Sequence, residues 1–272
     1  MSSFLFIAVV ISNLAYAQED SQELAFNFKK GQTIRYQVHQ ETSAFDSMGE
    51  FSSSVKNKTR VTKEWKIIET DINNVTTIEM RVIALLIETT MPNGELLKFN
   101  SELPDGPLKD SLLPIVGTVV AKLKVDSLGR VLEVIQCKFG KPSRFETEPP
   151  FAAVLHGQKI IPGQTWQRKY FATLEPPIGT GEKIGLVQNY IAKSVNKQIV
   201  TLNLETVSEK PFKNSVEEAS ILQMMPKGTL IFDKQKGLLK SADLSIDTEI
   251  KDVSGPGSSY RFQSIYRESL LD

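Results

Sequence analysis

Apolar and polar residues alternate one by one along many short runs of this 272-residue chain. Within residues 198–209, Val200, Leu202 and Leu204 alternate with polar neighbours. Successive side chains of a β-strand point to opposite faces of a sheet, so this spacing places one face against a core and the other in water. The same pattern occurs in residues 121–126, 243–250 and 260–267. The sequence therefore predicts a chain built largely from half-buried strands.

Short polar turns separate these runs and favour antiparallel pairing. They occupy residues 71–74, 92–94, 127–130, 194–197 and 234–237. Strands joined by short turns pair antiparallel, and long strands twist. Helical spacing occurs in two short segments, residues 107–116 and 215–225, and residues 151–155 are a third possible helix. We therefore predict a mainly β fold, a β-rich α+β arrangement of twisted antiparallel sheets.

An internal repeat divides the predicted fold into two related units. The tripeptide Gly31-Gln32-Thr33 recurs as Gly163-Gln164-Thr165, and each copy opens a strand. A helix, a strand, a glycine turn and a second strand follow in both halves, with the turns at Gly129 and Gly237. We interpret this as a degenerate duplication. It predicts a first β-rich unit over 18–140, a linker over 141–162 and a second β-rich unit over 163–272, each unit with a short helix covering its concave side.

The amino terminus has the pattern of a cleaved export signal. An apolar run, Phe4 to Leu14, is followed by the small-x-small sequence Ala15-Tyr16-Ala17. The run is too short to cross about 30 Å of hydrocarbon as a helix, and the chain turns polar directly after it. We predict a signal peptide over 1–17, cleavage after Ala17, and a mature protein in the periplasm, the cell envelope or outside the cell. No later stretch of sequence is apolar enough to predict a transmembrane helix.

Charge and composition exclude several classes of function. The chain has 32 Lys and Arg against 32 Asp and Glu, so it lacks the basic excess that binding to nucleic acid requires. With Cys137 as the single cysteine and with only two histidines, neither an internal disulfide nor a thiolate zinc site can form. We therefore predict no metal site and no cofactor.

Signals for catalysis are sparse. A nucleophilic hydrolase needs a serine or cysteine beside a histidine that a carboxylate orients, and the chain contains no Gly-x-Ser-x-Gly elbow. His156, which follows the proline-rich segment, is the residue that best fits a catalytic base on a loop. A hydrolase acting through His156 stays as an alternative function, and no catalytic residue is assigned.

An excess of apolar residues points to a different kind of site. In residues 77–89 both phases of the alternation become apolar, so we expect this strand to be covered on both faces. We expect one of the two short predicted helices to provide such a cover. In the helix over 215–225, which we place on the second unit, Ile221, Leu222 and Met225 share one side. Two interpretations remain open: a plain core beneath the helix, or a cavity that holds an apolar ligand against these three residues.

The signal peptide, the Gly-Gln-Thr strand openings, the junction from Pro162 to Trp166 and the glycine-centred hairpins resemble a family of exported bacterial proteins catalogued as a domain of unknown function. The resemblance implies a β fold and export, and it supplies no catalytic residues. Our first hypothesis is a non-enzymatic exported protein that binds an apolar small molecule or an envelope component. The alternatives are the hydrolase and a structural partner in an envelope assembly.

Overall fold

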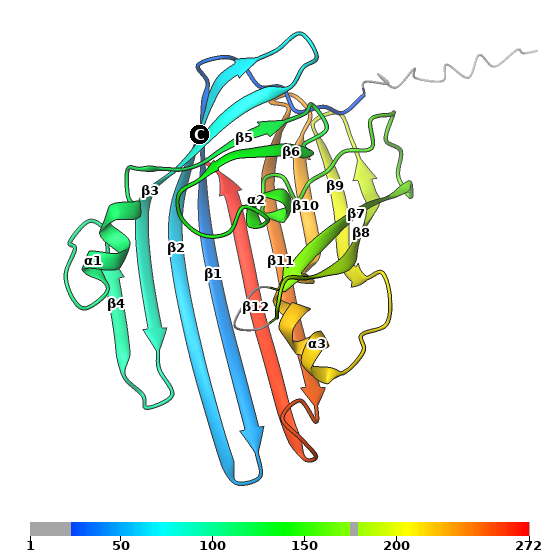
Figure 1. Ribbon diagram of the computed structural model, residues 1–272. Helices are drawn as coiled ribbons and strands as arrows, with labels where there is room; N and C mark the ends of the chain where they lie inside the picture. Colours follow the sequence, from blue (N-terminus) through cyan, green and yellow to red (C-terminus); the bar gives the residue numbers. More distant parts are fainter. Residues whose placement is uncertain (1–22, 175–178, 272) are drawn as a thin grey trace, which may run out of the picture.

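The computed structural model describes residues 23–174 and 179–271. The predicted signal peptide over 1–17 lies outside the described residues. Antiparallel strands dominate the molecule (Figure 1), and the helices are short. The strands are β1 (Thr33–Met48), β2 (Phe51–Thr70), β3 (Thr76–Thr90), β4 (Leu96–Asn100), β5 (Val119–Val125), β6 (Val131–Cys137), β7 (Thr165–Leu174), β8 (Glu182–Val195), β9 (Ile199–Ser208), β10 (Lys227–Asp233), β11 (Leu238–Lys251) and β12 (Ser258–Leu270). The helices are α1 (Lys109–Leu112), α2 (Arg144–Thr147) and α3 (Ser215–Ile221), with 3₁₀ turns over Leu113–Ile115 and Leu222–Met224.

The strands form one continuous sheet in the order β6-β5-β3-β2-β1-β12-β11-β10-β9-β8-β7, with β4 paired to β3. The prediction of a mainly β, antiparallel fold is confirmed. The predicted halves, however, share this single sheet, because β1 pairs with β12 along its length, from Tyr36 opposite Leu270 to Met48 opposite Ser258. This pairing satisfies the backbone groups that each half would otherwise expose at its edge. Among the described strands, β6 and β7 end this order, and β4 forms a further short edge beside β3.

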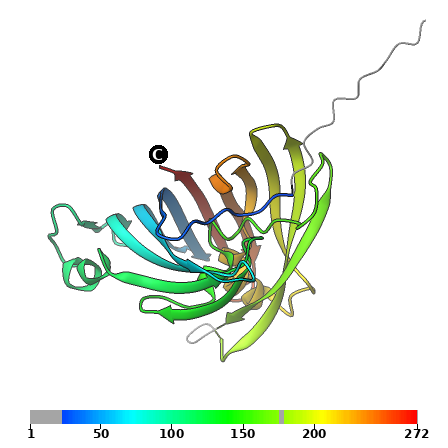
Figure 2. The same cartoon turned by 90° about the horizontal axis from the view of Figure 1, so that it is seen from above.

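The sheet curves around a concave face, which is visible from above in Figure 2. Residues 141–162, which we predicted as a linker, lie inside this curve, and we call them the plug. The middle of the plug is buried rather than exposed, because Phe145 and the apolar run Phe151 to Leu155 enter the main hydrophobic core, whereas its two ends are exposed. That core also takes in residues from both predicted units, including Trp65 and Phe232.

A bulge in β3 explains the run of residues that is apolar in both phases. Ile78, Met80 and Val82 are buried in one phase, and burial then passes to Leu85 in the other. The register against β2 shifts at this point, so that Ile83 is the extra residue, and its side chain is 39% exposed. The expectation of two covered faces is therefore wrong at Ile83: the phase changes because the strand is bulged.

Candidate functional site

Helix α3 places the predicted ligand residues in packed surroundings. The side chain of Asn214 caps the helix by accepting a hydrogen bond from the Glu217 backbone N–H at 2.9 Å. Ile221 is buried in a cluster contributed by β7 and β8, namely Ala172, Leu174, Ile184 and Leu186. Leu222 packs on Ile246 and Ile250 of β11. Helix α3 thus packs between the β7–β8 end of the sheet and β11, at the lower end of these strands in Figure 1.

Met225 lies just beyond this helix and is half-buried against the cluster around Ile221. Ile221, Leu222 and Met225 line neither of the two clefts described below. Their role in ligand binding stays a prediction, and their contacts favour a role in packing.

His156 lies at the end of the plug. Its Nδ1 is 3.2 Å from the side-chain amide nitrogen of Gln164, and its ring centre lies 5.7 Å from that of Trp166. An amide and an indole supply neither a nucleophile nor an orienting carboxylate. Within the described ranges no group of three His, Cys, Asp or Glu side chains could hold a metal ion, and no helix there has the length and apolarity to cross a bilayer.

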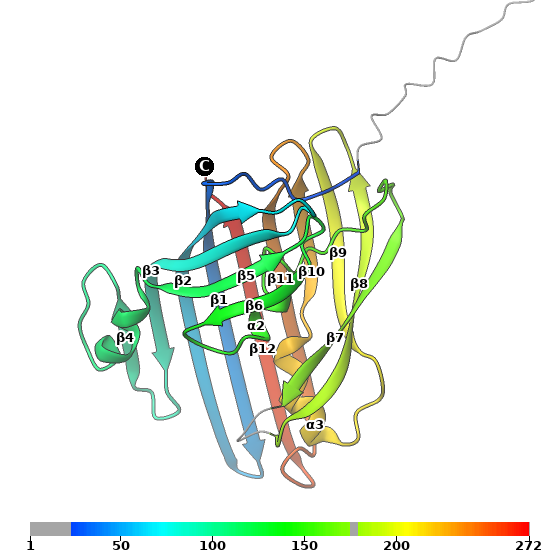
Figure 3. The same cartoon turned by 45° about the horizontal axis from the view of Figure 1, so that its top comes forward.

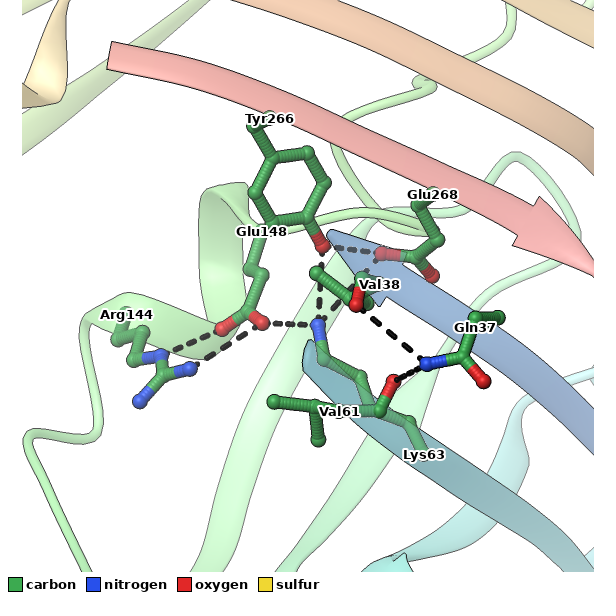
Figure 4. Close-up of polar contacts among 8 residues, drawn as sticks. All are labelled: Gln37, Val38, Val61, Lys63, Arg144, Glu148, Tyr266 and Glu268. Atoms are coloured by element: carbon green, nitrogen blue, oxygen red, sulfur yellow. Dashed lines mark hydrogen bonds and ion pairs between the residues drawn. The ribbon is translucent and has the colours of Figure 1, made fainter. Parts of the chain in front are cut away.

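A cluster of buried charges holds the plug against the centre of the sheet (Figure 4). Lys63 of β2 projects from the concave face with its side chain only 3% exposed. Its Nζ donates to a carboxylate oxygen of Glu148 on the plug and, at 3.0 Å, to the hydroxyl of Tyr266 on β12. Tyr266 in turn donates to Glu268, whose carboxylate lies 3.5 Å from Lys63 Nζ. Arg144 pairs with Glu148 from within the plug.

The two carboxylates of this cluster have opposite pKa shifts. Burial raises the pKa of Glu268 to about 7, against the attraction of Lys63. Burial would raise the pKa of Glu148 as well, but Arg144 and Lys63 outweigh it and lower the pKa to about 2. Among the described residues Oε1 of Glu268 has no hydrogen-bond partner. Glu148 is therefore the stable anion of the cluster, and Glu268 is the group that titrates near neutral pH.

Aromatic residues hold the remainder of the plug. The Tyr190 hydroxyl donates to the carbonyl of Ala152, and Trp166 Nε1 donates to that of Val154, both at 2.8 Å. The rings of Tyr190 and Trp166 stack with their centres 5.4 Å apart. The concave face is thus filled in large part by the chain's own residues.

A cleft of about 1050 Å³ lies beside the plug, at one end of the strands. Its walls come from residues 23–28, from residues 159–162 at the end of the plug, and from the β2–β3, β5–β6, β8–β9 and β10–β11 turns. The apolar part of the lining consists of Leu24, Phe26, Phe28, Ile160, Ile161, Val195 and Val200, together with Ala25 and Pro162. A smaller cleft of about 480 Å³ shares residues 23–25.

Segment 23–28 crosses these strand ends, as Figure 3 shows in dark blue. Its backbone is fixed at two turns: Phe26 N donates to Ser127 O at 2.7 Å, and Asn27 N donates to Gly237 O at 2.9 Å. A Cβ on Gly237 would lie 2.5 Å from the Asn27 Cβ, and one on Gly129 would lie 2.5 Å from the Phe26 ring. The two turn glycines, which the sequence repeat singled out, therefore allow this segment to approach.

Sequence reasoning missed both segment 23–28 and the plug as parts of the site. The signal for the first was present, since Leu24, Phe26 and Phe28 alternate with polar residues or alanine. The signal for the plug was a lysine at position 63, in phase with Val61 and Trp65, because a lysine on an inward face needs a buried acid.

Comparisons with known proteins assign no family. No family model and no curated protein matches this sequence. A solved structure titled "Lipid-protein interactions in lipovitellin" aligns with 90% of this chain and 26% of its own, at 10% identity and a TM-score of 0.46. The complex of MucA and MucB from Pseudomonas aeruginosa aligns with 84% of this chain and 88% of its own, at 8% identity and a TM-score of 0.14. These likenesses are too distant to carry a functional argument.

Proposed function

We propose that the protein is an exported, non-enzymatic binding protein that takes an apolar ligand into the cleft beside segment 23–28. The observation that carries this proposal is a space of about 1050 Å³ whose lining includes seven Leu, Ile, Val or Phe side chains. Small-molecule sites are typically concave, of roughly 300–1000 Å³, and lined by apolar groups with a few polar ones. Burial of a ligand's apolar surface here would supply about 25 cal/mol per Å².

Support for a binding role also comes from the rigidity of the cleft walls. The Phe26 ring lies edge-on to Phe232 at 5.1 Å and stacks on Phe28 at 5.4 Å. Two backbone hydrogen bonds fix the same segment to the turns of the sheet. A wall held in this way loses little further conformational entropy when a ligand binds.

Export is the second part of the proposal, and it rests on the apolar run followed by Ala15-Tyr16-Ala17. We expect the mature protein to begin at Gln18, because signal peptidase cuts after a small-x-small pattern. Amino-terminal sequencing of the protein recovered outside the cytoplasm checks this, and an intact Met1 on the exported protein would contradict it.

The binding proposal predicts saturable uptake of an apolar fluorescent reporter such as N-phenyl-1-naphthylamine. Ala25 is exposed and lines the cleft, so the change Ala25→Trp should fill the space while leaving the core intact. We expect the variant to bind the reporter about tenfold more weakly or worse. Fluorescence titration measures this effect.

Val216→Trp on α3 is the matched control, since Val216 is exposed and lines neither cleft. It should bind the reporter as the unaltered protein does. A third variant, Met225→Trp, tests the site that the sequence suggested. Loss of reporter binding in Met225→Trp but not in Ala25→Trp would place the binding site at α3 instead of the cleft. Absence of saturable binding by the unaltered protein would contradict the proposal altogether.

A further inference from the structure

Positive charge gathers at one end of the cleft. Three lysines line it: Lys159 from the plug, Lys197 from the β8–β9 turn and Lys234 from the β10–β11 turn. One acid, Glu23, lines the same cleft. These four are the charged residues among the described residues of the lining, so the cleft carries a positive excess although the whole chain is neutral.

Hydrogen bonds hold together the three segments that carry these lysines. Lys234 N donates to Gln198 O at 2.8 Å, and Lys234 Nζ donates to Asn196 O at 3.1 Å, which places this side chain at the turn that carries Lys197. The end of the plug is tied to β8, because Gly163 N donates to Ala192 O at 2.7 Å. Lys159 therefore enters the cleft from the segment next to the same turn.

The acid lies toward the other end. Glu23 also lines the smaller cleft, together with Asp126 and Arg130 of the β5–β6 turn. The hydrogen bond from Phe26 to Ser127 holds its segment against that turn. Glu23 is thus held toward the β5–β6 turn, whereas the three lysines come from the end of the plug and from the β8–β9 and β10–β11 turns.

No ion pair within the described ranges neutralises these lysines. None of the salt bridges recorded there involves Lys159, Lys197 or Lys234, whereas many lysines on the strands have a partner, such as Lys124 with Glu133 at 2.7 Å. Lys159 and Lys197 are exposed, and Lys234 is half-buried. The ammonium groups are therefore available to an anion that enters with the ligand.

We infer that the ligand is an amphiphile with an anionic head group, such as a long-chain carboxylate or a phosphate monoester. This inference rests on the proposed function. The head group contacts Lys159, Lys197 and Lys234, and the hydrocarbon chain lies along Val195, Ile160 and Leu24. Exposed ion pairs contribute only modestly to the binding free energy. The charge of the head group is therefore expected to raise affinity about tenfold over an uncharged amphiphile with a hydrocarbon chain of the same length.

Competition between dodecanoate and dodecanol tests the inference. Each is added at pH 8, below its solubility limit or micelle formation, to protein loaded with the naphthylamine reporter. We expect dodecanoate to displace the reporter at about one tenth of the dodecanol concentration in low salt, and the difference to shrink as salt screens the lysines. Inorganic phosphate and acetate alone should leave the reporter bound, because they bury no apolar surface.

Substitution of two of the lysines is the second arm. Lys159→Gln with Lys197→Gln should remove the preference for dodecanoate. The matched control is Lys66→Gln with Lys240→Gln, two exposed strand lysines that do not line the cleft, and it should keep the preference.

The outcomes separate the two claims. Equal displacement by acid and alcohol, or a preference that survives in the double variant, would overturn the head-group inference and leave the apolar site standing. Displacement of the reporter by inorganic phosphate alone would also overturn the head-group inference, because the cleft would then bind a free anion. Absence of reporter binding would overturn the proposed function itself.

Discussion

Replacing Phe151 by alanine is expected to lower the free energy of unfolding by about 3–5 kcal/mol. The ring is 1% exposed, lies edge-on to Trp65 at 5.1 Å, and is 6.2 Å from Phe26. Its removal leaves a cavity at the point where the plug, segment 23–28 and the sheet meet. Denaturant unfolding followed by tryptophan fluorescence measures the loss.

Phe171→Ala provides the matched control, because this phenylalanine on β7 is 61% exposed. Its substitution should change the free energy of unfolding by no more than about 0.5 kcal/mol. If Phe151→Ala unfolds at the same denaturant concentration as the unaltered protein, the plug is not part of the core. The plug would then cover the sheet without contributing to the free energy of unfolding.

The free energy of unfolding is also expected to fall by about 3 kcal/mol as the pH rises from about 4.5 to above 7. The cause is Glu268, whose pKa is raised from the ordinary 4.5 to about 7 in the folded protein by burial. The folded state binds this proton more tightly than the unfolded state does. The stabilisation is therefore complete below about pH 4.5 and is lost as the pH rises through 7.

The groups around Glu268 determine how the free energy of unfolding depends on pH at more acidic and more basic values. Glu148 has a pKa lowered to about 2, so its contribution is present above its ordinary pKa of 4.5 and is lost as the pH falls toward 2. Burial raises the pKa of Tyr266 well above its ordinary value. Stability should therefore be greatest in mildly acidic solution, between the losses caused by Glu148 and by Glu268.

Glu268→Gln tests the assignment, because glutamine keeps the shape and does not titrate. We expect the fall in stability between pH 4.5 and 8 to flatten in this variant, as measured by urea unfolding at several pH values. Glu249→Gln, on the exposed face of β11, should keep the profile of the unaltered protein. A fall that persists unchanged in Glu268→Gln would assign the titration to another group.

Local features of the fold could be predicted from the sequence because each depends on neighbours along the chain. The alternation of Val200, Leu202 and Leu204 predicted the inward face of β9, and all three are buried. The turn glycines Gly129 and Gly237 lie at the hairpins where the sequence placed them. The short helix over 215–225 was also predicted, although it ends as a 3₁₀ turn.

The candidate site was much less predictable. The sequence suggested Ile221, Leu222 and Met225, which share a helix side, whereas the cleft is assembled from segment 23–28, the end of the plug and four turns. A helix side is a local property of the chain. A cleft between loops depends on which turns meet in space, and no spacing of residues encodes that.

By itself, then, the sequence determined the strand faces and the turns, since a period of two residues defines which side chains point inward. It did not determine the partner of each strand, because every half-buried strand offers the same alternation and the same backbone groups. Only the tertiary structure decided that β1 pairs with β12 and merges the two repeats into one sheet. It alone also brought Glu148 of the plug to Lys63 of β2. A buried charge is costly unless it is paired, and its partner in the fold can lie at any distance along the chain.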